Sequence, residues 1–184
     1  MAWAFVNKFA VDEILNLYVS LKPQIIDPKR NLEFLHAIST FTKASVGSAA
    51  VTTYYEVRQA LGGFGYSYYS ELHEMINNGD INTTWEGDNR VLLQQTARFL
   101  MKNCNRVATG KEVSTEHLGY FKAFNEDKAG MLAKVADIDF NAEDLGLSQV
   151  IQVYQYFAAK TAFRGMDHFT EALGAGKDMF EVYL

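Results

Sequence analysis

Residues 87–108, GDNRVLLQQTARFLMKNCNRVA, carry the clearest structural signal in the chain. Apolar or small side chains recur in this stretch at alternating steps of four and three residues, at Leu93, Ala97, Leu100, Cys104 and Val107. This spacing places them on one face of a helix, because an α-helix has 3.6 residues per turn. We therefore predict a helix from near Gly87 to about Ala108, with Cys104 as a small buried apolar residue rather than a reactive thiol.

The same periodicity predicts other helices along the chain. They are expected at about residues 2–21, 31–61, 67–77, 115–135 and 146–173. Turns or linkers are expected at 22–30, which contains Pro23 and Pro28, at 77–80 and at 109–114. No convincing run of alternating strand residues is present. The predicted fold class is all-α, with the helices packed as a bundle.

Three local features refine this prediction. Small residues at positions 44–50 favour close helix packing, and the glycines at 62, 63 and 65 are expected to end the second helix. Asp144 is a candidate cap for the last helix. The face of that helix expected to be buried comprises Leu147, Val150, Ile151, Tyr154, Phe157, Ala158 and Thr161.

Composition excludes several classes of function. The chain has 184 residues, of which 48% are apolar and 21% charged, as is ordinary for a globular protein. Its net charge of -5 argues against nucleic acid as a partner, since phosphate binding needs a basic face. No stretch is apolar for long enough to predict a membrane span. The single cysteine cannot form an internal disulfide, which favours a reducing compartment.

Glu86 is the candidate for chemistry. It lies between Trp85 and Gly87, just before the long helix. Burial beside the indole would disfavour the ionised carboxylate, whereas the positive end of the helix would favour it. A carboxylate between such influences can act as a general base, but taken by themselves these residues favour the other interpretation, an acidic loop that caps the helix. The four histidines have no metal-ligand spacing, and no metal site is predicted.

Three blocks of sequence resemble the acyl-CoA oxidases, flavoenzymes related to the acyl-CoA dehydrogenases. They are RQALGGFGY at 58–66, INTTWEGDN at 81–89 and VLLQQTARFL at 91–100. The resemblance covers about residues 2–108 and is thin beyond them. It implies an oxidase-like helical bundle with a catalytic-base loop at 1–108, similar to the C-terminal domain of the family. Residues 109–184 are then further helices that begin, in part, a second helical region.

The resemblance also implies a mechanism. In this family a glutamate removes a proton from the α-carbon of a fatty acyl-CoA, and the β-carbon gives a hydride to FAD. The products are a trans-2-enoyl-CoA and, after reoxidation by O2, H2O2. The matching glutamate is Glu86. The positions that match the cofactor segments of the family are Gln59, Gly62, Gly63, Gly87, Asp88 and Asn89. Leu61 and Phe64 depart from the cysteine and histidine usual in the family.

An acyl-CoA oxidase also contains an N-terminal helical domain and a middle β domain, and the resemblance covers neither of them. We therefore expect it to hold part of such an enzyme and to work as a homo-oligomer or with a complementary chain. The alternatives are a non-catalytic structural subunit of a larger assembly and a related dehydrogenase that passes electrons to a carrier protein. The family implies a peroxisomal location, with a mitochondrial one as the alternative, although the C-terminus shows no targeting tripeptide.

Overall fold

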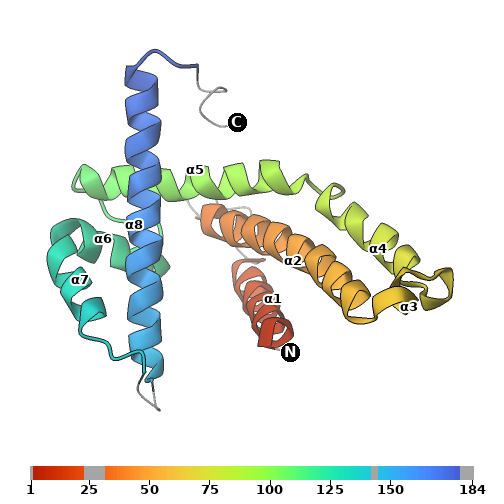
Figure 1. Ribbon diagram of the computed structural model, residues 1–184. Coiled ribbons are helices and arrows are strands. Elements are labelled where there is room, and N and C mark those ends of the chain that lie inside the picture. The colour runs from red at the N-terminus through yellow and green to blue at the C-terminus, as the bar shows by residue number, and fades with distance from the viewer. Residues whose placement is uncertain (1, 23–31, 142–144, 179–184) are drawn as a thin grey trace. The chain divides into compact units, whose positions relative to one another are not determined.

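The computed structural model of the chain describes residues 2–22, 32–141 and 145–178 (Figure 1). Every regular element within these ranges is a helix, so the all-α prediction is confirmed. The chain divides into two compact units, residues 1–96 and 97–184, and each is described by itself. The expectations at Pro23, Pro28 and Asp144 fall outside the described residues.

The first unit is built around one long helix, α2. Its elements are α1 (Ala2–Leu21), α2 (Leu32–Ala60), α3 (Gly62–Tyr66), η2 (Tyr68–Ser70), α4 (Leu72–Asp80), η3 (Ile81–Thr83) and the first part of α5 (Asn89–Ala108). α1, α3, α4 and η3 all contact α2. The predicted bounds of α1, α2 and α5 are confirmed to within two residues.

Small residues on α2 let the neighbouring chain approach closely, as expected. Ala37 and Ala44 are buried on this helix. A Cβ at Gly47 would lie 3.3 Å from the carbonyl oxygen of Asn82 and 3.4 Å from the amide nitrogen of Asn89. The absence of a side chain at Gly47 therefore lets the loop before α5 pack closely against the backbone of α2.

The turn predicted at residues 77–80 is wrong, because α4 continues through it to Asp80. Gly79 is buried, and a Cβ there would lie only 2.4 Å from Cε2 of Tyr54 on α2. The glycine serves contact between two helices rather than chain reversal. The helix predicted at 67–77 is also shifted, since a short 3-10 turn precedes α4.

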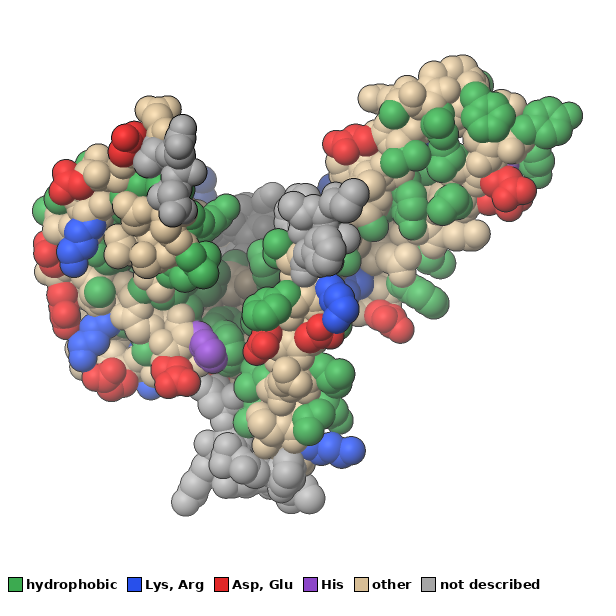
Figure 2. Space-filling view, turned by 90° about the horizontal axis from the view of Figure 1, so that it is seen from below, with side chains coloured by type: hydrophobic (Ala, Val, Ile, Leu, Met, Phe, Trp, Pro, Cys, Tyr) green, Lys and Arg blue, Asp and Glu red, His purple; other side chains and the backbone are tan. Residues whose placement is uncertain are grey.

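The glycine-rich segment ends α2 as predicted, but it also forms a short helix of its own. Gly62 has a left-handed φ of 57°, and α3 begins at this residue. Exposed aromatic side chains gather over α3 and η2, at the end of the α2–α4 hairpin (Figure 2). They are Phe64, Tyr66, Tyr68 and Tyr69, which are 59% to 88% exposed.

The second unit contains the rest of α5 and four further elements. These are η4 (Glu116–Leu118), α6 (Gly119–Glu126), α7 (Lys128–Ala136) and α8 (Leu147–Gly174). Its core is an aromatic cluster in which the ring of Phe124 lies 5.5 Å from Phe163 and 5.7 Å from Tyr156. Packing of α6 and α7 against α8 produces this cluster.

The helix expected at 115–135 is in fact three elements. α6 ends at Glu126, and the side chain of Asp127 caps α7 by accepting a hydrogen bond from Gly130 N at 2.8 Å. Aspartate is favoured at the N-terminal cap of a helix over the helix interior, since its short carboxylate can reach the free backbone N–H groups of the first turn.

The face of α8 predicted to be buried is wrong. Tyr156, Ala159 and Phe163 are buried, whereas much of the predicted face is exposed. The exposed residues are Leu147, Ile151, Tyr154 and Phe157, at 75%, 45%, 73% and 52%. α8 carries apolar residues on two faces, and α6 and α7 cover the face that contains Tyr156, Ala159 and Phe163. We call Leu147, Ile151, Tyr154 and Phe157 the α8 row.

The prediction for Cys104 is confirmed. Its side chain is fully buried, and burial raises the pKa of the thiol to about 12, with a smaller contribution from the charge of Asp167. The neutral thiol is thus strongly favoured. On the same helix Val107 is buried as predicted, but Leu93 is 44% exposed.

Candidate functional site

Glu86 lines a cleft of about 430 Å³ in the first unit. The cleft is bounded by α1, by one face of α2 and by the loop between η3 and α5. Its lining residues are Val11, Ile14, Ser39, Thr42, Lys43, Val46, Gly47, Ala50, Asn82, Trp85 and Glu86. Most of the wall is apolar, so the carboxylate stands at the edge of a surface suited to hydrocarbon.

The loop holds Glu86 in an uncommon backbone conformation. Its φ is 54°, in the left-handed region that residues other than glycine seldom occupy. Such a conformation costs on the order of 1–3 kcal/mol and persists only when its surroundings impose it. The loop before α5 therefore stores strain at the residue that carries the candidate base.

The expectation that Glu86 is buried beside Trp85 is not met within this chain. The glutamate is exposed, and Trp85 is 53% exposed. The indole Nε1 instead donates a hydrogen bond to Oδ1 of Asn82 at 2.8 Å, and Trp85 N donates to Ile81 O at 2.9 Å. Hydrogen bonds rather than burial hold Trp85 in the cleft wall.

The helix cap is Asp88. Its Oδ1 accepts hydrogen bonds from the backbone N–H groups of Arg90, at 2.9 Å, and Val91, at 3.3 Å. Because Asp88 fills the capping role at the start of α5, the carboxylate of Glu86 is left to the cleft. Gly87 has a φ of 109°, and a Cβ there would lie 2.9 Å from Cδ2 of Leu92, so this position requires glycine.

Asn89 anchors the loop to α2. It is 8% exposed, and its Nδ2 donates to the carbonyl of Ala44 at 3.1 Å and to Oγ of Ser48 at 3.0 Å. Its Oδ1 accepts a hydrogen bond from Nζ of Lys43 at 2.8 Å. The amide is thus used within the chain, which supports an anchoring role for Asn89 rather than direct contact with a cofactor.

Gln59, Gly62 and Gly63 lie at the other end of α2. From Gly47, beside the loop, to the end of the helix at Ala60 is about 20 Å at 1.5 Å per residue. All three residues are exposed, and no atom lies within 4 Å of a Cβ built at Gly62 or Gly63. A flat group can approach this backbone closely, so the segment fits a cofactor surface. The structure does not bring it together with Glu86.

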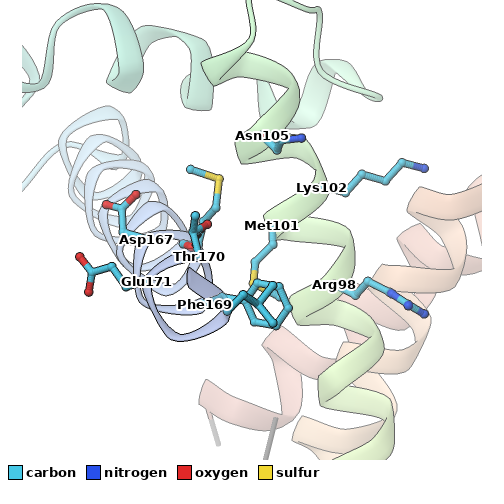
Figure 3. A pocket seen from close by; sticks show the side chains of 10 residues that line it. Arg98, Met101, Lys102, Asn105, Asp167, Phe169, Thr170 and Glu171 are labelled. Carbon is cyan, nitrogen blue, oxygen red and sulfur yellow. Dashed lines mark hydrogen bonds between the residues drawn. The ribbon is translucent and has the colours of Figure 1, made fainter. Parts of the chain in front are cut away.

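A larger cleft, of about 750 Å³, lies between α5 and α8 in the second unit (Figure 3). Met101 and Phe169 meet at its centre, whereas Arg98 on α5 and Asp167 on α8 point away from the gap (Figure 3). The gap presents no converging polar groups, so the smaller cleft with Glu86 is the better candidate for chemistry.

Among residues 2–22, 32–141 and 145–178, no three His, Cys, Asp or Glu side chains lie close enough together to hold a metal ion. Among the same residues, no helix is both long and apolar enough to cross a membrane.

Comparison with known proteins identifies the family of the first unit. The sequence model for "Acyl-CoA oxidase, C-alpha1 domain" matches residues 1–101, more than half of the chain. The chain belongs to the acyl-CoA oxidase family. Both the resemblance seen in the three sequence blocks and the helical fold expected from it are confirmed.

Curated relatives share these helices at moderate identity. The peroxisomal acyl-coenzyme A oxidase 2 of Oryctolagus cuniculus is 34% identical over 105 residues, which are 56% of this chain and 15% of that protein. The peroxisomal acyl-coenzyme A oxidase 1 of Homo sapiens is 43% identical over 79 residues, which are 43% of this chain and 12% of that protein. The chain therefore spans only about an eighth to a seventh of the length of these relatives.

Solved structures show the same fold over nearly the whole chain. Arabidopsis thaliana acyl-CoA oxidase 1 matches 95% of it with a TM-score of 0.74 and 23% identity, over 26% of that protein. An acyl-CoA oxidase-1 from Caenorhabditis elegans, solved with FAD and ATP, matches 95% with a TM-score of 0.70 and 22% identity, also over 26%. The likeness thus extends over the second unit, where the sequence resemblance is thin.

Sequence reasoning missed Lys43. Its Nζ donates to the carbonyl oxygen of Gly87 at 2.5 Å, in addition to its bond to Asn89. The available signal was a lysine on an otherwise small or apolar face of α2, one turn before Gly47. A half-buried ammonium group in that position must find acceptors.

Proposed function

We propose that this chain supplies the catalytic base of an FAD-dependent acyl-CoA oxidase, and that Glu86 removes the α-proton of a fatty acyl-CoA. The overall reaction yields a trans-2-enoyl-CoA and reduces O2 to H2O2. One observation carries the proposal. Glu86 lies in the wall of a mostly apolar cleft, on a strained loop that is tied to α2. Asp88 caps α5, so helix capping does not account for the glutamate at position 86.

The chemistry needs such a base. A proton beside a thioester is only weakly acidic, so the carboxylate must be held in a fixed position against the α-carbon. Ile14, Val46 and Ala50 offer an apolar wall next to it for the acyl chain. Glu86 is exposed in this chain, so we propose that the rest of the enzyme covers the cleft and excludes water.

Gln59, Gly62 and Gly63 are the residues of this chain that we propose to hold FAD, through open backbone at the end of α2. When bound, FAD accepts the hydride from the β-carbon. Since these residues lie about 20 Å along α2 from the loop of Glu86, we propose that they serve a different copy or a complementary chain. The names of the curated relatives support a peroxisomal location.

The test is the Glu86→Gln variant of the intact enzyme. Glutamine keeps the shape of the side chain but cannot take the proton, so we expect turnover of a fatty acyl-CoA to fall roughly 10²–10⁴-fold. Peroxide release and anaerobic bleaching of the flavin by substrate measure it. Glu71→Gln is the matched control, because Glu71 is also an exposed glutamate with a left-handed φ, of 58°. Unchanged turnover in Glu86→Gln would disprove the proposal.

A second candidate function is a non-catalytic subunit with an oxidase-derived fold. The exposed aromatic side chains over α3 and η2 favour it, because a subunit that binds partner helices needs such a surface. The absorption spectrum of the intact assembly would then show no bands of FAD. Flavin that is released in stoichiometric amount on denaturation would exclude this candidate.

A further inference from the structure

We propose that Lys43 is a positioning residue that fixes the direction in which Glu86 enters the cleft. The inference rests on the proposed function of Glu86 as the base. It starts from two hydrogen bonds of one ammonium group, to the carbonyl oxygen of Gly87 at 2.5 Å and to Oδ1 of Asn89 at 2.8 Å. Lys43 and Glu86 also line the same cleft.

The bond to Gly87 acts directly on the strained part of the loop. The Gly87 carbonyl belongs to the peptide bond between Gly87 and Asp88, directly after the residue that follows Glu86. Gly87 itself has a φ of 109°. Glycine alone would leave this point free to rotate, because it has no Cβ to restrict it. Lys43 removes that freedom by holding the carbonyl oxygen, and the left-handed backbone of Glu86 is thereby imposed from the side of α2.

The bond to Asn89 completes the attachment. Asn89 is joined in turn to Ala44 and Ser48, so the loop is fastened to about one and a half turns of α2. Hydrogen bonds that involve a charged group are about twice as strong as neutral ones. Lys43 is therefore the strongest single link between the loop and the helix that forms the cleft wall.

An ammonium group has three N–H donors, and Lys43 uses two of them in these bonds. The third could serve an incoming ligand, which defines a competing role in substrate binding. The two roles differ kinetically. A positioning residue affects the chemical step and lowers kcat, whereas loss of a ligand contact that is equal in ground and transition states raises KM.

The experiment replaces Lys43 in the intact enzyme. Lys43→Met keeps an unbranched side chain, one atom shorter than that of lysine, and removes its donors. Lys43→Arg keeps the charge but cannot place a planar guanidinium on both acceptors in the same way. Lys8→Met is the control, since Lys8 is an exposed lysine on α1 that pairs with Asp12 four residues on.

For Lys43→Met we expect kcat to fall roughly 10- to 100-fold, because a misplacement of about 1 Å can cost that much, while KM changes less than about twofold. Lys43→Arg should recover part of the loss, and Lys8→Met should match the wild type. Amide hydrogen exchange at Arg90, Val91 and Leu92, in the first turn of α5, should become faster in Lys43→Met only.

Two outcomes overturn the inference. They are an unchanged kcat, whether or not KM is raised, and unchanged amide exchange at residues 90–92. If Lys43→Met does not fold, Lys43→Arg decides, and full wild-type kcat in that variant counts against the inference. Failure of the proposed function is recognised separately, by turnover that survives Glu86→Gln, whatever the Lys43 variants show.

Discussion

The loops that precede α4 and α5 both contain an exposed glutamate in a left-handed conformation, yet they are held in different ways. The loop at Glu71 is local, since Ser70 Oγ binds Gly65 and Ser67 within five residues. The loop at Glu86 is attached to α2 by Lys43 and Asn89, over 41 to 46 residues of sequence. Residue type and backbone angle therefore do not define a site. Long-range attachment and an adjoining cleft do.

The comparison is broken most directly by shortening each glutamate. Glu86→Asp withdraws the carboxylate by one methylene. If Glu86 is the base, as we propose, we expect kcat of the intact enzyme to fall roughly 10²-fold, because the shortened carboxylate no longer reaches the proton in the right geometry. Glu71→Asp should leave kcat within error. Steady-state assays of peroxide release measure both, and equal losses in the two variants would remove the distinction between the loops.

Asn89→Ala tests the attachment of the α5 loop. It removes the side-chain hydrogen bonds to the Ala44 carbonyl, to Ser48 Oγ and from the Lys43 ammonium, so we expect a loss of about 2 kcal/mol in the free energy of unfolding. Asn78→Ala, at an exposed position of α4, should change it by less than about 0.5 kcal/mol. Urea denaturation followed by circular dichroism compares them. A small effect at Asn89 would mean that the loop is held elsewhere.

Asp88→Ala tests the capping role. Loss of the two hydrogen bonds to the first turn of α5 should cost about 1 kcal/mol of unfolding free energy. Glu71→Ala should cost less than about 0.5 kcal/mol, since the Glu71 side chain makes no capping bond to α4. The same denaturation experiment gives both values, and a costly Glu71→Ala would show that the loops are capped alike.

The smallest effect concerns backbone strain. Glycine adopts a left-handed φ without the Cβ penalty, so Glu86→Gly and Glu71→Gly should each raise the unfolding free energy, by about 0.5–1 kcal/mol. Thermal melting of the two variants measures this. Stabilisation at Glu71 alone would show that the contacts of the Glu86 side chain already offset its strain.

Periodicity predicted the long helices well, because α2, α5 and α8 each bury at least part of an apolar stripe. It failed where the same residues are compatible with two different structures. Gly79 has the composition of a turn but fills a helix contact with Tyr54, and α8 has two apolar faces of which the partners in the fold select one. Asp127 divides a helix that its neighbours would continue.

The candidate site divides in the same way. Local sequence and the family resemblance located Glu86, and the structure adds the roles of Asp88 and Asn89. Lys43 could not be found locally, because its bond to Gly87 joins residues 44 positions apart. Only the packing of the loop on α2 reveals that contact.

The α8 row has a practical consequence for handling the protein. When the chain is expressed by itself, Leu147, Ile151, Tyr154 and Phe157 meet water along one side of a 28-residue helix. Exposed apolar surface of this kind drives colloidal self-association, and sulfate strengthens it by being excluded from protein surfaces. We therefore expect the solubility of the isolated, folded chain to depend on the type and concentration of salt. We expect the self-association to occur through the α8 row.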